Sequence, residues 1–421
     1  MTRVLIVGAG PAGIRAAQRL VAAGLHPVVV DEGTRAGGQI YRRPPEGFKR
    51  PARTLYGSEA DKAVALHGCF DSMLEAAQLS YHPRSSVVAL EGQTAQVLGP
   101  QGVEIIAYDK LILATGATDR LAPVPGWQSA GVYSLGATQI ALKSQGVALG
   151  RRMVLAGSGP LLTLVASQLR KAGAQVAAVL DTAPLRTQAA GAIGMALARP
   201  RVTLRGAALR AGLGRSYHAG VTLTRIATDG TGPTAIHWQD ARGRDHATPC
   251  DMVGLGWHLR AETHLTDLAG VSMAWDQVSH QWLPESDAMG RAAAGETGRA
   301  LKELRRMQRF ASAMQRAFPW PAQMVRALPA DTVLCRCESI SVGDLRTTLS
   351  LSGPEANRAK SLSRVGMGRC QGRYCQLAGA EILAAESGVP VDRIGRLRSQ
   401  PPVRPAPISA YLDKAPDART K

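Results

Sequence analysis

Four cysteines near the C-terminal end of the chain have the composition of a metal or iron–sulfur ligand set: Cys335, Cys337, Cys370 and Cys375. Four thiolates are what a 2Fe-2S cluster requires, with two sulfur ligands for each iron. Structural zinc also takes four thiolates, but its paired ligands usually stand two to four residues apart, so the Cys-x-Cys pair favours the cluster. The pattern therefore predicts one-electron chemistry, with structural zinc or unliganded thiols as the alternatives.

The residues around these cysteines suit a bound anion. An oxidised 2Fe-2S core with four thiolates carries two negative charges, which nearby cations and backbone N–H groups stabilise. Such groups are supplied by Arg336, Arg369, Arg373, Gly366, Gly368 and Gly372. Ser341 and Asp344 have the spacing of a capping box at the start of a helix, and another helix is expected from Gln376. We therefore expect the cysteines at helix N-termini, where the helix dipole favours negative charge.

A dinucleotide-binding fingerprint stands at the N-terminus. The apolar run at 4–7 predicts a buried parallel strand. A GxGxxG loop follows it, made of Gly8, Gly10, Pro11, Ala12 and Gly13. In such a loop the first glycine makes the turn, the second lets the backbone approach a pyrophosphate, and the third lets the helix pack on the strand. A helix to Gly24 and a strand at 27–30 are expected next, with Asp31 as the ribose-binding acid and Glu32 as the alternative.

The cysteine motif extends over two segments. Residues 335–338 read Cys-Arg-Cys-Glu, and residues 366–375 read Gly-Met-Gly-Arg-Cys-Gln-Gly-Arg-Tyr-Cys. They resemble the cluster domain related to bacterioferritin-associated ferredoxin. The form of that domain to which they are most similar is fused to the FAD-dependent large (A or alpha) subunits of bacterial opine oxidases, hydroxyproline and proline dehydrogenases and hydrogen cyanide synthase. The resemblance covers the region before the C-terminal tail and implies a flavoprotein that also carries an iron–sulfur centre.

Two further segments indicate a flavin site rather than an ordinary nicotinamide site. Residues 37–43, which include Gly38 and Gln39, resemble the flavin-facing loop of the same oxidoreductase family. Residues 110–116 resemble the strand with which two-dinucleotide flavoproteins finish the first half of the FAD domain, and they end in Ala114, Thr115 and Gly116. The order of these segments predicts bound FAD.

A second dinucleotide-type turn lies at 157–162, after a strand expected at 152–156. Leu162 replaces its third glycine, and a leucine there would push the helix away from the strand. The strand expected at 176–180 and Asp181 keep the rest of the pattern. A Rossmann-like fold is therefore expected here. Whether the turn holds NAD(P), another nucleotide or none stays open at this point.

One part of the flavoprotein pattern is missing. Flavoproteins of this group carry a Gly-Asp turn after the second domain, and its Asp holds the ribityl chain of FAD. Residues 251–256 are expected to return to the FAD domain as a strand, and 292–309 to form the long helix that follows the turn. The interval between them is too short for the turn, and Asp287 is a weak substitute. Looser FAD binding, a lost flavin and a loop supplied by a partner are the three explanations.

Composition limits the remaining classes of function. The chain has 421 residues, 45% of them apolar, and no apolar stretch long enough to span a membrane. Free thiolates and the absence of a signal-like N-terminus favour a cytoplasmic location.

The net charge of +18 comes from scattered arginines without a nucleic-acid reader element. The basic patch at 302–309 is expected to be a solvated helix face or, second, a contact with an acidic subunit or a membrane surface. Cys69 and Cys250 are expected to be inert buried thiols.

The expected fold class is α/β, with two dinucleotide-binding (Rossmann-like) domains of the two-dinucleotide flavoprotein type and a small, mainly helical 2Fe-2S domain. The segments are 1–125 and 240–320 for the FAD-binding domain, 126–239 for the inserted second domain, 333–390 for the 2Fe-2S domain and 391–421 for a proline-rich tail. These boundaries place the cysteine motif and the fingerprint in separate parts of the fold.

The expected function is electron relay in a heteromeric dehydrogenase, from FAD through the 2Fe-2S centre to a respiratory acceptor. No acid–base or nucleophile constellation is evident, so substrate oxidation is expected on a partner, an amine-oxidase-like FAD subunit, with a small ferredoxin-like subunit as a second partner. The resemblance implies secondary amines such as opines, D-hydroxyproline or proline, or glycine, as substrates. A self-sufficient NAD(P)H:acceptor reductase and a non-catalytic assembly subunit with a degenerate flavin site are the alternatives.

Overall fold

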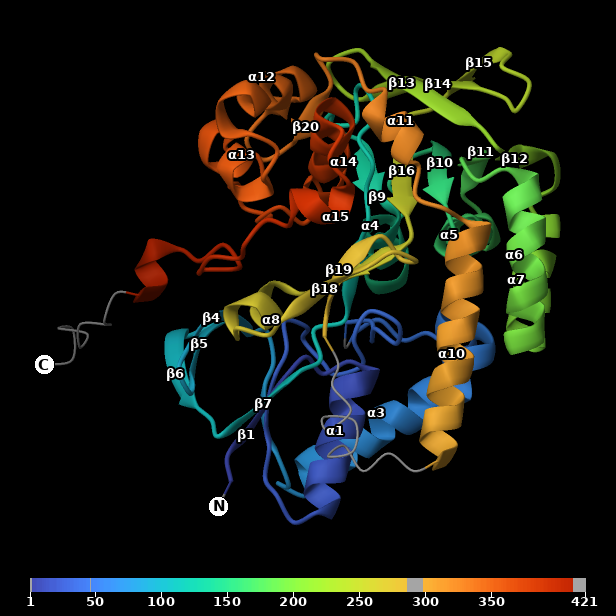
Figure 1. The fold of residues 1–421 in the computed structure, drawn as a ribbon. Helices are drawn as coiled ribbons and strands as arrows, with labels where there is room; N and C mark the ends of the chain where they lie inside the picture. The colour runs from blue at the N-terminus through green and yellow to red at the C-terminus, as the bar shows by residue number, and fades with distance from the viewer. Residues whose placement is uncertain (1, 46, 286–297, 412–421) are drawn as a thin grey trace, which may run out of the picture.

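The N-terminal apolar run forms the centre of a parallel sheet in the computed structural model, which describes residues 2–45, 47–285 and 298–411. The strand order is β3-β2-β1-β7 (Figure 1). The strands are β1 (Val4–Val7), β2 (Val28–Val30), β3 (Ser80–His82) and β7 (Lys110–Leu113). All residues of β1 are buried because neighbouring strands flank it and helices cover it. The strands expected at 4–7 and 27–30 are thereby confirmed, and the strand expected at 110–116 is present but ends at Leu113.

Helices and a small antiparallel sheet complete this first region. The helices are α1 (Pro11–Ala22), α2 (Ala52–Tyr56), α3 (Ala60–Glu75) and the 3-10 turn η1 (Gly57–Glu59). The antiparallel strands are β4 (Ser86–Glu91), β5 (Thr94–Gly99) and β6 (Gly102–Ala107). The helix α1 begins within the fingerprint loop, at Pro11, so the loop lies at the carboxyl end of β1, where open α/β sheets bind ligands.

A second parallel sheet has the strand order β12-β11-β10-β16-β9. Its strands are β9 (Val132–Ser134), β10 (Arg152–Ser158), β11 (Gln175–Asp181), β12 (Tyr217–Ala219) and β16 (Met252–Trp257). The expected return of 251–256 to the first sheet is wrong, because β16 pairs in parallel with β10 and β9. Every residue of β16 is buried, as this interior position requires.

The second sheet is covered by helices and extended by an antiparallel sheet. The helical elements are α4 (Leu135–Ile140), the π-helix η2 (Ala141–Gln145), α5 (Pro160–Lys171), α6 (Leu185–Ala198), α7 (Pro200–Ala211) and the 3-10 turn η3 (Gly214–Ser216). The antiparallel strands are β13 (Thr222–Thr228), β14 (Pro233–Gln239) and β15 (Asp245–Pro249). The Rossmann-like fold expected for this region is therefore present.

Short elements and one long helix connect the two sheets with the cysteine motif. They are β8 (Ala117–Asp119) with its antiparallel partner β17 (Leu259–Ala261), α8 (His264–Leu268), the hairpin β18 (Met273–Asp276) and β19 (Gln281–Pro284), and α10 (Gly298–Ala317). The helix α10 packs along α6, not beside the first sheet, because Gly191 and Gly194 allow close approach. A Cβ on Gly191 would lie only 2.4 Å from the Cβ of Ala317.

The cysteine region is mainly helical. Its elements are α11 (Ala322–Arg326), β20 (Val333–Cys335), β21 (Ile340–Ser341), α12 (Val342–Ser352), α13 (Ala356–Ser363), α14 (Gln376–Ser387), α15 (Val391–Ile394) and, in the tail, the 3-10 turn η4 (Ile408–Tyr411). The capping box at the start of α12 is confirmed, since Ser341 Oγ accepts from the Asp344 N–H at 3.1 Å and the Asp344 carboxylate accepts from the Ser341 N–H at 2.8 Å.

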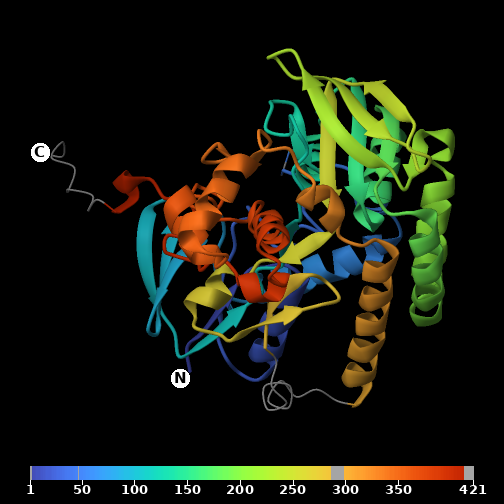
Figure 2. The same cartoon turned by 45° about the horizontal axis from the view of Figure 1, so that its top comes forward.

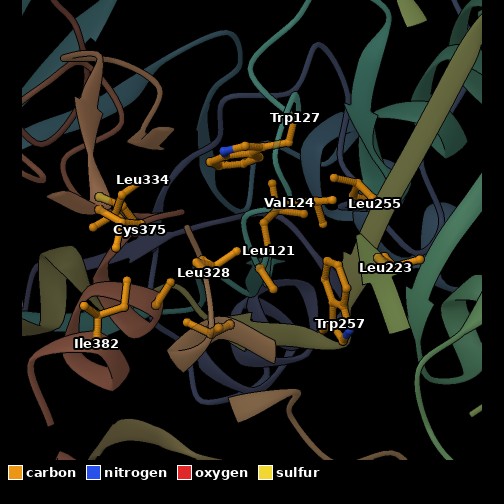
Figure 3. Close-up of a cluster of buried hydrophobic side chains, with 14 of the residues drawn as sticks. Leu121, Val124, Trp127, Leu223, Leu255, Trp257, Leu328, Leu334, Cys375 and Ile382 are labelled. Carbon is orange, nitrogen blue, oxygen red and sulfur yellow. The ribbon is translucent and has the colours of Figure 1, made fainter. Parts of the chain in front are cut away.

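The cysteine region shares its core with the second sheet. Figure 3 shows buried side chains running from Trp257 and Leu223 past Leu121 to Leu334 and Cys375. Helices α12, α13 and α14 lie on the opposite side of the molecule from α6, α7 and α10 (Figures 1 and 2). Because this core is continuous, the thiols are held at a fixed position relative to the second sheet.

Within the described ranges, no helix combines the length and the apolar composition needed to cross a membrane.

Candidate cofactor sites

The fingerprint loop is packed against the end of β7, the second strand of the predicted flavin site. Gly8 has a φ of +105°, and a Cβ there would lie 2.4 Å from the carbonyl oxygen of Ala114. A Cβ on Gly13 would lie 1.8 Å from the carbonyl oxygen of Gly8. These two glycines are therefore required by the fold itself. A Cβ on Gly10 would meet nothing closer than 3.7 Å, so the space at this glycine is available to a ligand.

Asp31 and Glu32, the two candidate ribose-binding acids, have different partners in the structure. The carboxylate of Asp31 accepts hydrogen bonds from the Ala9 N–H at 2.6 Å and the Gly33 N–H at 2.7 Å. Burial raises the pKa of Asp31 above its ordinary value, against the effect of these two N–H donors. Glu32 is at the surface and forms an ion pair with Arg404 of the tail at 2.6 Å. Asp31 thus holds the loop in shape, and the ribose role of either acid stays a prediction.

The predicted flavin-facing loop lies directly against the fingerprint loop. The Gly37 N–H donates to the Ala9 carbonyl at 2.8 Å, and a Cβ on Gly38 would come within 2.7 Å of the Gly10 Cα. Gln39 is exposed and accepts a hydrogen bond from Arg42 at 2.7 Å. The structure therefore brings the segments 8–13, 37–39 and 114–116 together at one edge of the first sheet. The remaining predicted loop residues, Pro11 and Ala12, begin α1 at this edge.

Glu262 fixes this edge to the next segment of the chain. Thr115 Oγ1 donates to the Glu262 carbonyl at 2.9 Å, and the Glu262 N–H donates to the Gly116 carbonyl at 3.0 Å. Glu262 directly follows β17, which pairs with β8. The backbone of Glu262 is therefore tied to the last two residues of the predicted flavin strand.

The side chain of Glu262 connects this strand to the cysteine loop. Its buried carboxylate accepts from Arg373 Nε at 2.6 Å and Arg373 Nη2 at 3.1 Å. His264 Nδ1 lies 2.6 Å from the same carboxylate, and His264 Nε2 lies 2.8 Å from the Gln371 carbonyl oxygen. Burial by itself raises the pKa of Glu262, but the His264 hydrogen bond and the Arg373 charge together lower it well below its ordinary value. We call Glu262, His264 and Arg373 the Glu262 bridge.

The four cysteines come together in two pairs. The thiols of Cys335 and Cys375 are hydrogen-bonded to each other, and so are those of Cys337 and Cys370. The Cys375 hydrogen bond lowers the pKa of Cys335 to about 6. Burial raises the pKa of Cys370 to about 11. The hydrogen bond with Cys335 and burial raise the pKa of Cys375 well above its ordinary value. The hydrogen bond with Cys375 therefore favours the thiolate form of Cys335.

Backbone N–H groups point at these sulfurs. Cys335 receives N–H groups from Cys337, Glu338 and Gly366, and Cys370 receives them from Gly372 and Tyr374. Gly366 and Gly372 have φ values of +81° and +78°, so glycine is favoured at both positions. Two thiol pairs surrounded by N–H donors fit an anionic cluster that takes two sulfurs on each iron. In the described part of the chain, however, no three or more His, Cys, Asp or Glu side chains form a group that could hold a metal ion. The ligand set stays a prediction.

Some details around the cysteines differ from expectation. Cys375 is the N-cap of α14, but Cys335 ends a strand and Cys337 and Cys370 lie in turns, so only Cys375 stands at a helix N-terminus. The guanidinium of Arg373 is directed to Glu262, and Arg336 lies over the ring of Trp127 at 5.1 Å. The expectation of helix N-termini is therefore wrong for three cysteines, because backbone N–H groups in turns take the place of helix ends.

The second dinucleotide turn is covered by the chain itself. A Cβ on Gly159 would lie 3.0 Å from the ring of His258, and His258 Nε2 lies 2.7 Å from the Phe318 carbonyl oxygen. Asp181 is fully buried, and its carboxylate accepts from Ser158 Oγ at 2.8 Å, the Ala183 N–H at 2.8 Å and the Tyr217 hydroxyl at 2.6 Å. Burial raises the pKa of Asp181 to about 6. Both of its oxygens are thus used within the protein.

Sequence reasoning did not single out the residues of β17 and the position after it. Arg260, Glu262 and His264 alternate directly after the apolar strand β16. Charged residues at every second position after a buried strand are a usable signal, since one face of such a segment must find polar partners.

The segment containing Asp287 and the expected Gly-Asp turn lies outside the described residues. Of the two remaining cysteines, Cys250 is buried and burial raises the pKa of its thiol to about 11, while Cys69 is half-buried.

Comparisons with known proteins agree with this geometry. The family model of the pyridine nucleotide-disulphide oxidoreductases matches residues 2–211. L-proline dehydrogenase from P. horikoshii has the same fold, with a TM-score of 0.67 over 98% of this chain and 80% of that chain at 17% identity. With two Rossmann-like sheets and the fingerprint loop, the protein is an FAD-dependent oxidoreductase of the two-dinucleotide flavoprotein class.

Full-length relatives give the particular family. The A subunit of opine oxidase from Rhizobium meliloti is 33% identical, and the match covers 99% of this chain and 88% of the relative. The HcnB subunit of hydrogen cyanide synthase from Pseudomonas protegens is 29% identical over 97% of both chains. The chain therefore belongs to the family that includes the A subunits of opine oxidases.

Proposed function

We propose that this chain is the electron-transfer flavin and iron–sulfur subunit of a heteromeric dehydrogenase that acts on secondary amines or amino acids. FAD would be held by the loop 8–13 together with 37–39 and 114–116, and a 2Fe-2S cluster by Cys335, Cys337, Cys370 and Cys375. When bound, the flavin supplies two-electron acceptance with one-electron release, and the cluster supplies one-electron transfer. The final acceptor is proposed to be respiratory.

The Glu262 bridge is the observation that carries this proposal. One buried residue is bonded through its backbone to Thr115 and Gly116 and through its carboxylate to Arg373, inside the cysteine loop. Separating the two partners of a buried charge pair would leave each as an uncompensated buried charge. The two side chains therefore stay in contact, and their geometry is fixed. The bridge therefore sets the position of the predicted cluster ligands relative to the predicted flavin strand.

The relatives support the partner and the substrate class. Both of the full-length relatives named above are subunits of larger enzymes, an opine oxidase and a hydrogen cyanide synthase. We infer that an amine-oxidase-like FAD subunit oxidises the substrate, that the complex is a hetero-oligomer, and that a small ferredoxin-like subunit is a further partner. Opines, D-hydroxyproline or proline, and glycine are the candidate substrates.

Two features weigh on the alternatives. A self-sufficient NAD(P)H:acceptor reductase needs a nicotinamide site, but His258 lies on Gly159 and Asp181 is sealed by its three donors. We infer that the second turn keeps the fold without binding a nucleotide. The assembly-subunit alternative rests on the missing Gly-Asp turn, and residues 286–297 lie outside the described part of the chain.

The test uses the full chain, purified under anaerobic conditions with its partner subunits. Flavin is measured by absorption, iron and zinc by metal analysis, and the reduced cluster by electron paramagnetic resonance. Cys370→Ser and Cys375→Ser are expected to lose iron and the resonance signal while flavin content is unchanged. A stoichiometric zinc content without iron, or wild-type signals in both variants, overturns the cluster assignment.

A second variant tests the bridge. Glu262→Gln removes the charge that Arg373 faces, so electrons are expected to pass more slowly from reduced flavin to the cluster in stopped-flow absorption. The matched control is Glu303→Gln, whose carboxylate pairs with Arg306 at the surface at 3.3 Å. Equal transfer rates in both variants and the wild type, at equal flavin and iron content, contradict a coupling role for Glu262.

A further inference from the structure

A cavity of about 50 Å³ lies where three parts of the chain meet. Its wall is formed by residues next to β8 and β17, by the hairpin β18–β19, and by the start of α14 with residues 395–399. The residues that matter here are Arg120, Arg260, Trp275, His280 and Trp282. Arginine and histidine are the ionisable side chains most numerous in this wall, and no Asp or Glu of the described ranges lines it.

Arg120 is a buried cation with free donors. Its residue surface is 3% exposed, and its Nη1 donates to the Ser279 carbonyl at 2.7 Å. The Nε and Nη2 atoms have no hydrogen-bond partner in the described structure. Buried donors are almost always paired, since leaving one unpaired costs about 1–3 kcal/mol. Two unpaired N–H groups on one buried guanidinium point to a missing acceptor.

Arg260 brings a second cation to the same cavity. Its Nη1 donates to the Arg373 carbonyl at 3.1 Å, and among the described residues neither Arg260 nor Arg120 forms an ion pair with a carboxylate. Burial and the charge of Arg260 lower the pKa of Arg120 to about 10. Two like charges that line one cavity repel each other, and an anion between them would offset this repulsion.

Three carboxylates near this wall already have arginine partners. Glu262 is bonded to Arg373, Asp267 is paired with Arg396 at 2.6 Å, and Glu381 is paired with Arg326 at 2.8 Å. Arg260 lies close to Cys370 and Cys375, whereas Arg120 interacts with Arg260, His258 and His280, and its guanidinium lies 5.6 Å over the ring of Trp320. The cysteines therefore do not supply the acceptor that Arg120 lacks.

We propose that this cavity binds a small oxyanion, a phosphate or a carboxylate, between Arg120 and Arg260. Guanidinium groups bind such anions through paired N–H donors. A polar cavity needs about 10–15 Å³ for each water, so this space suits a small anion and is far too small for a nucleotide. The proposed site is distinct from the fingerprint loop, although His264 and Arg373 of the Glu262 bridge also line it, and it does not depend on the proposed function.

The test is thermal unfolding of the purified full chain in inorganic phosphate, sodium acetate or sodium chloride at equal ionic strength. A ligand that binds only the native state stabilises it in a saturable way. Phosphate or acetate is expected to raise Tm by about 2–4 °C over chloride at saturation, and the anion with the larger effect identifies the chemistry preferred. Isothermal titration calorimetry with the same anion measures binding directly.

Two variants and a control decide the assignment. Arg120→Met and Arg260→Gln are expected to lose the saturable rise, and Arg120→Met is expected to melt above the wild type in chloride because an unpaired buried charge is gone. Arg242→Gln, at an exposed turn, should respond like the wild type. If Arg120→Met does not fold, Arg260→Gln and calorimetry still decide. Equal Tm in all three salts, or an unchanged response in Arg260→Gln, overturns the proposal.

Discussion

The two dinucleotide turns begin with the same pattern but lie in opposite surroundings. A Cβ on Gly10, the second glycine of the first turn, would meet nothing closer than 3.7 Å, whereas at Gly159 of the second turn the ring of His258 is 3.0 Å away. The acid after the first turn is half-buried, and Asp181 after the second is fully buried with three donors. A glycine pattern can thus preserve a fold even where, as we infer for the second turn, no nucleotide binds. Four variants test how far the two turns have diverged.

The largest effect is expected at Leu162, the residue that replaces the third glycine. Its side chain is fully buried in the core between α5 and the second sheet. Leu162→Ala leaves a cavity and should lower the free energy of unfolding by about 2–5 kcal/mol. Chemical denaturation followed by circular dichroism measures this loss. Gain of NADH binding by Leu162→Ala, with stability unchanged, would mean that the leucine merely blocks a site.

The next largest effect is expected at Asp181, where the free energy of unfolding should depend on pH. Its folded pKa of about 6 is above the ordinary 3.8, so the native state holds this proton more tightly than the unfolded state does. The contribution of Asp181 to stability is therefore full below pH 3.8, falls as the pH rises to about 6, and stays low above that. Asp181→Asn should remove this fall and be more stable than the wild type near pH 7 by up to about 3 kcal/mol.

Urea denaturation of the wild type and of Asp181→Asn across this pH range measures the difference. The exposed Asp245→Asn variant is the control and should follow the wild-type profile. A difference between wild type and Asp181→Asn that does not change with pH contradicts a buried, protonatable Asp181. A carboxylate open to a nucleotide ribose would give that result.

The sequence predicted the framework better than the site. The run 4–7 specifies a buried strand because its apolar residues need cover on both faces, whereas 110–113 forms a strand that is only partly buried. The run 252–257 specifies a strand equally well, but nothing in six buried apolar residues states which sheet the strand joins, and the expected sheet was the wrong one. Glu262 was missed for a related reason, since its partner Arg373 is 111 positions away and only the folded chain brings the pair together.

A smaller effect is expected at Gly10, and it falls on the ligand instead of on the fold. Gly10 has an extended backbone with a φ of −78°, which alanine adopts without strain. Gly10→Ala should keep the wild-type Tm and weaken FAD binding about tenfold, which corresponds to about 1.4 kcal/mol. Flavin fluorescence titration of the deflavinated chain measures the affinity. Gly68→Ala, in open space on α3, is the control and should keep full FAD affinity.

The smallest effect is expected at Glu32, the alternative ribose acid. Its side chain is 54% exposed and paired with Arg404, and exposed ion pairs contribute about 0–1 kcal/mol. Because Asp31 is the acid that reaches the fingerprint loop, Glu32→Gln should change stability by less than about 1 kcal/mol and leave FAD affinity unchanged. Arg404→Gln is the matched variant, since it breaks the same pair and keeps the carboxylate. A tenfold loss of FAD affinity in Glu32→Gln alone would assign the ribose contact to Glu32 and make Asp31 a purely structural acid, in closer likeness to Asp181 of the second turn.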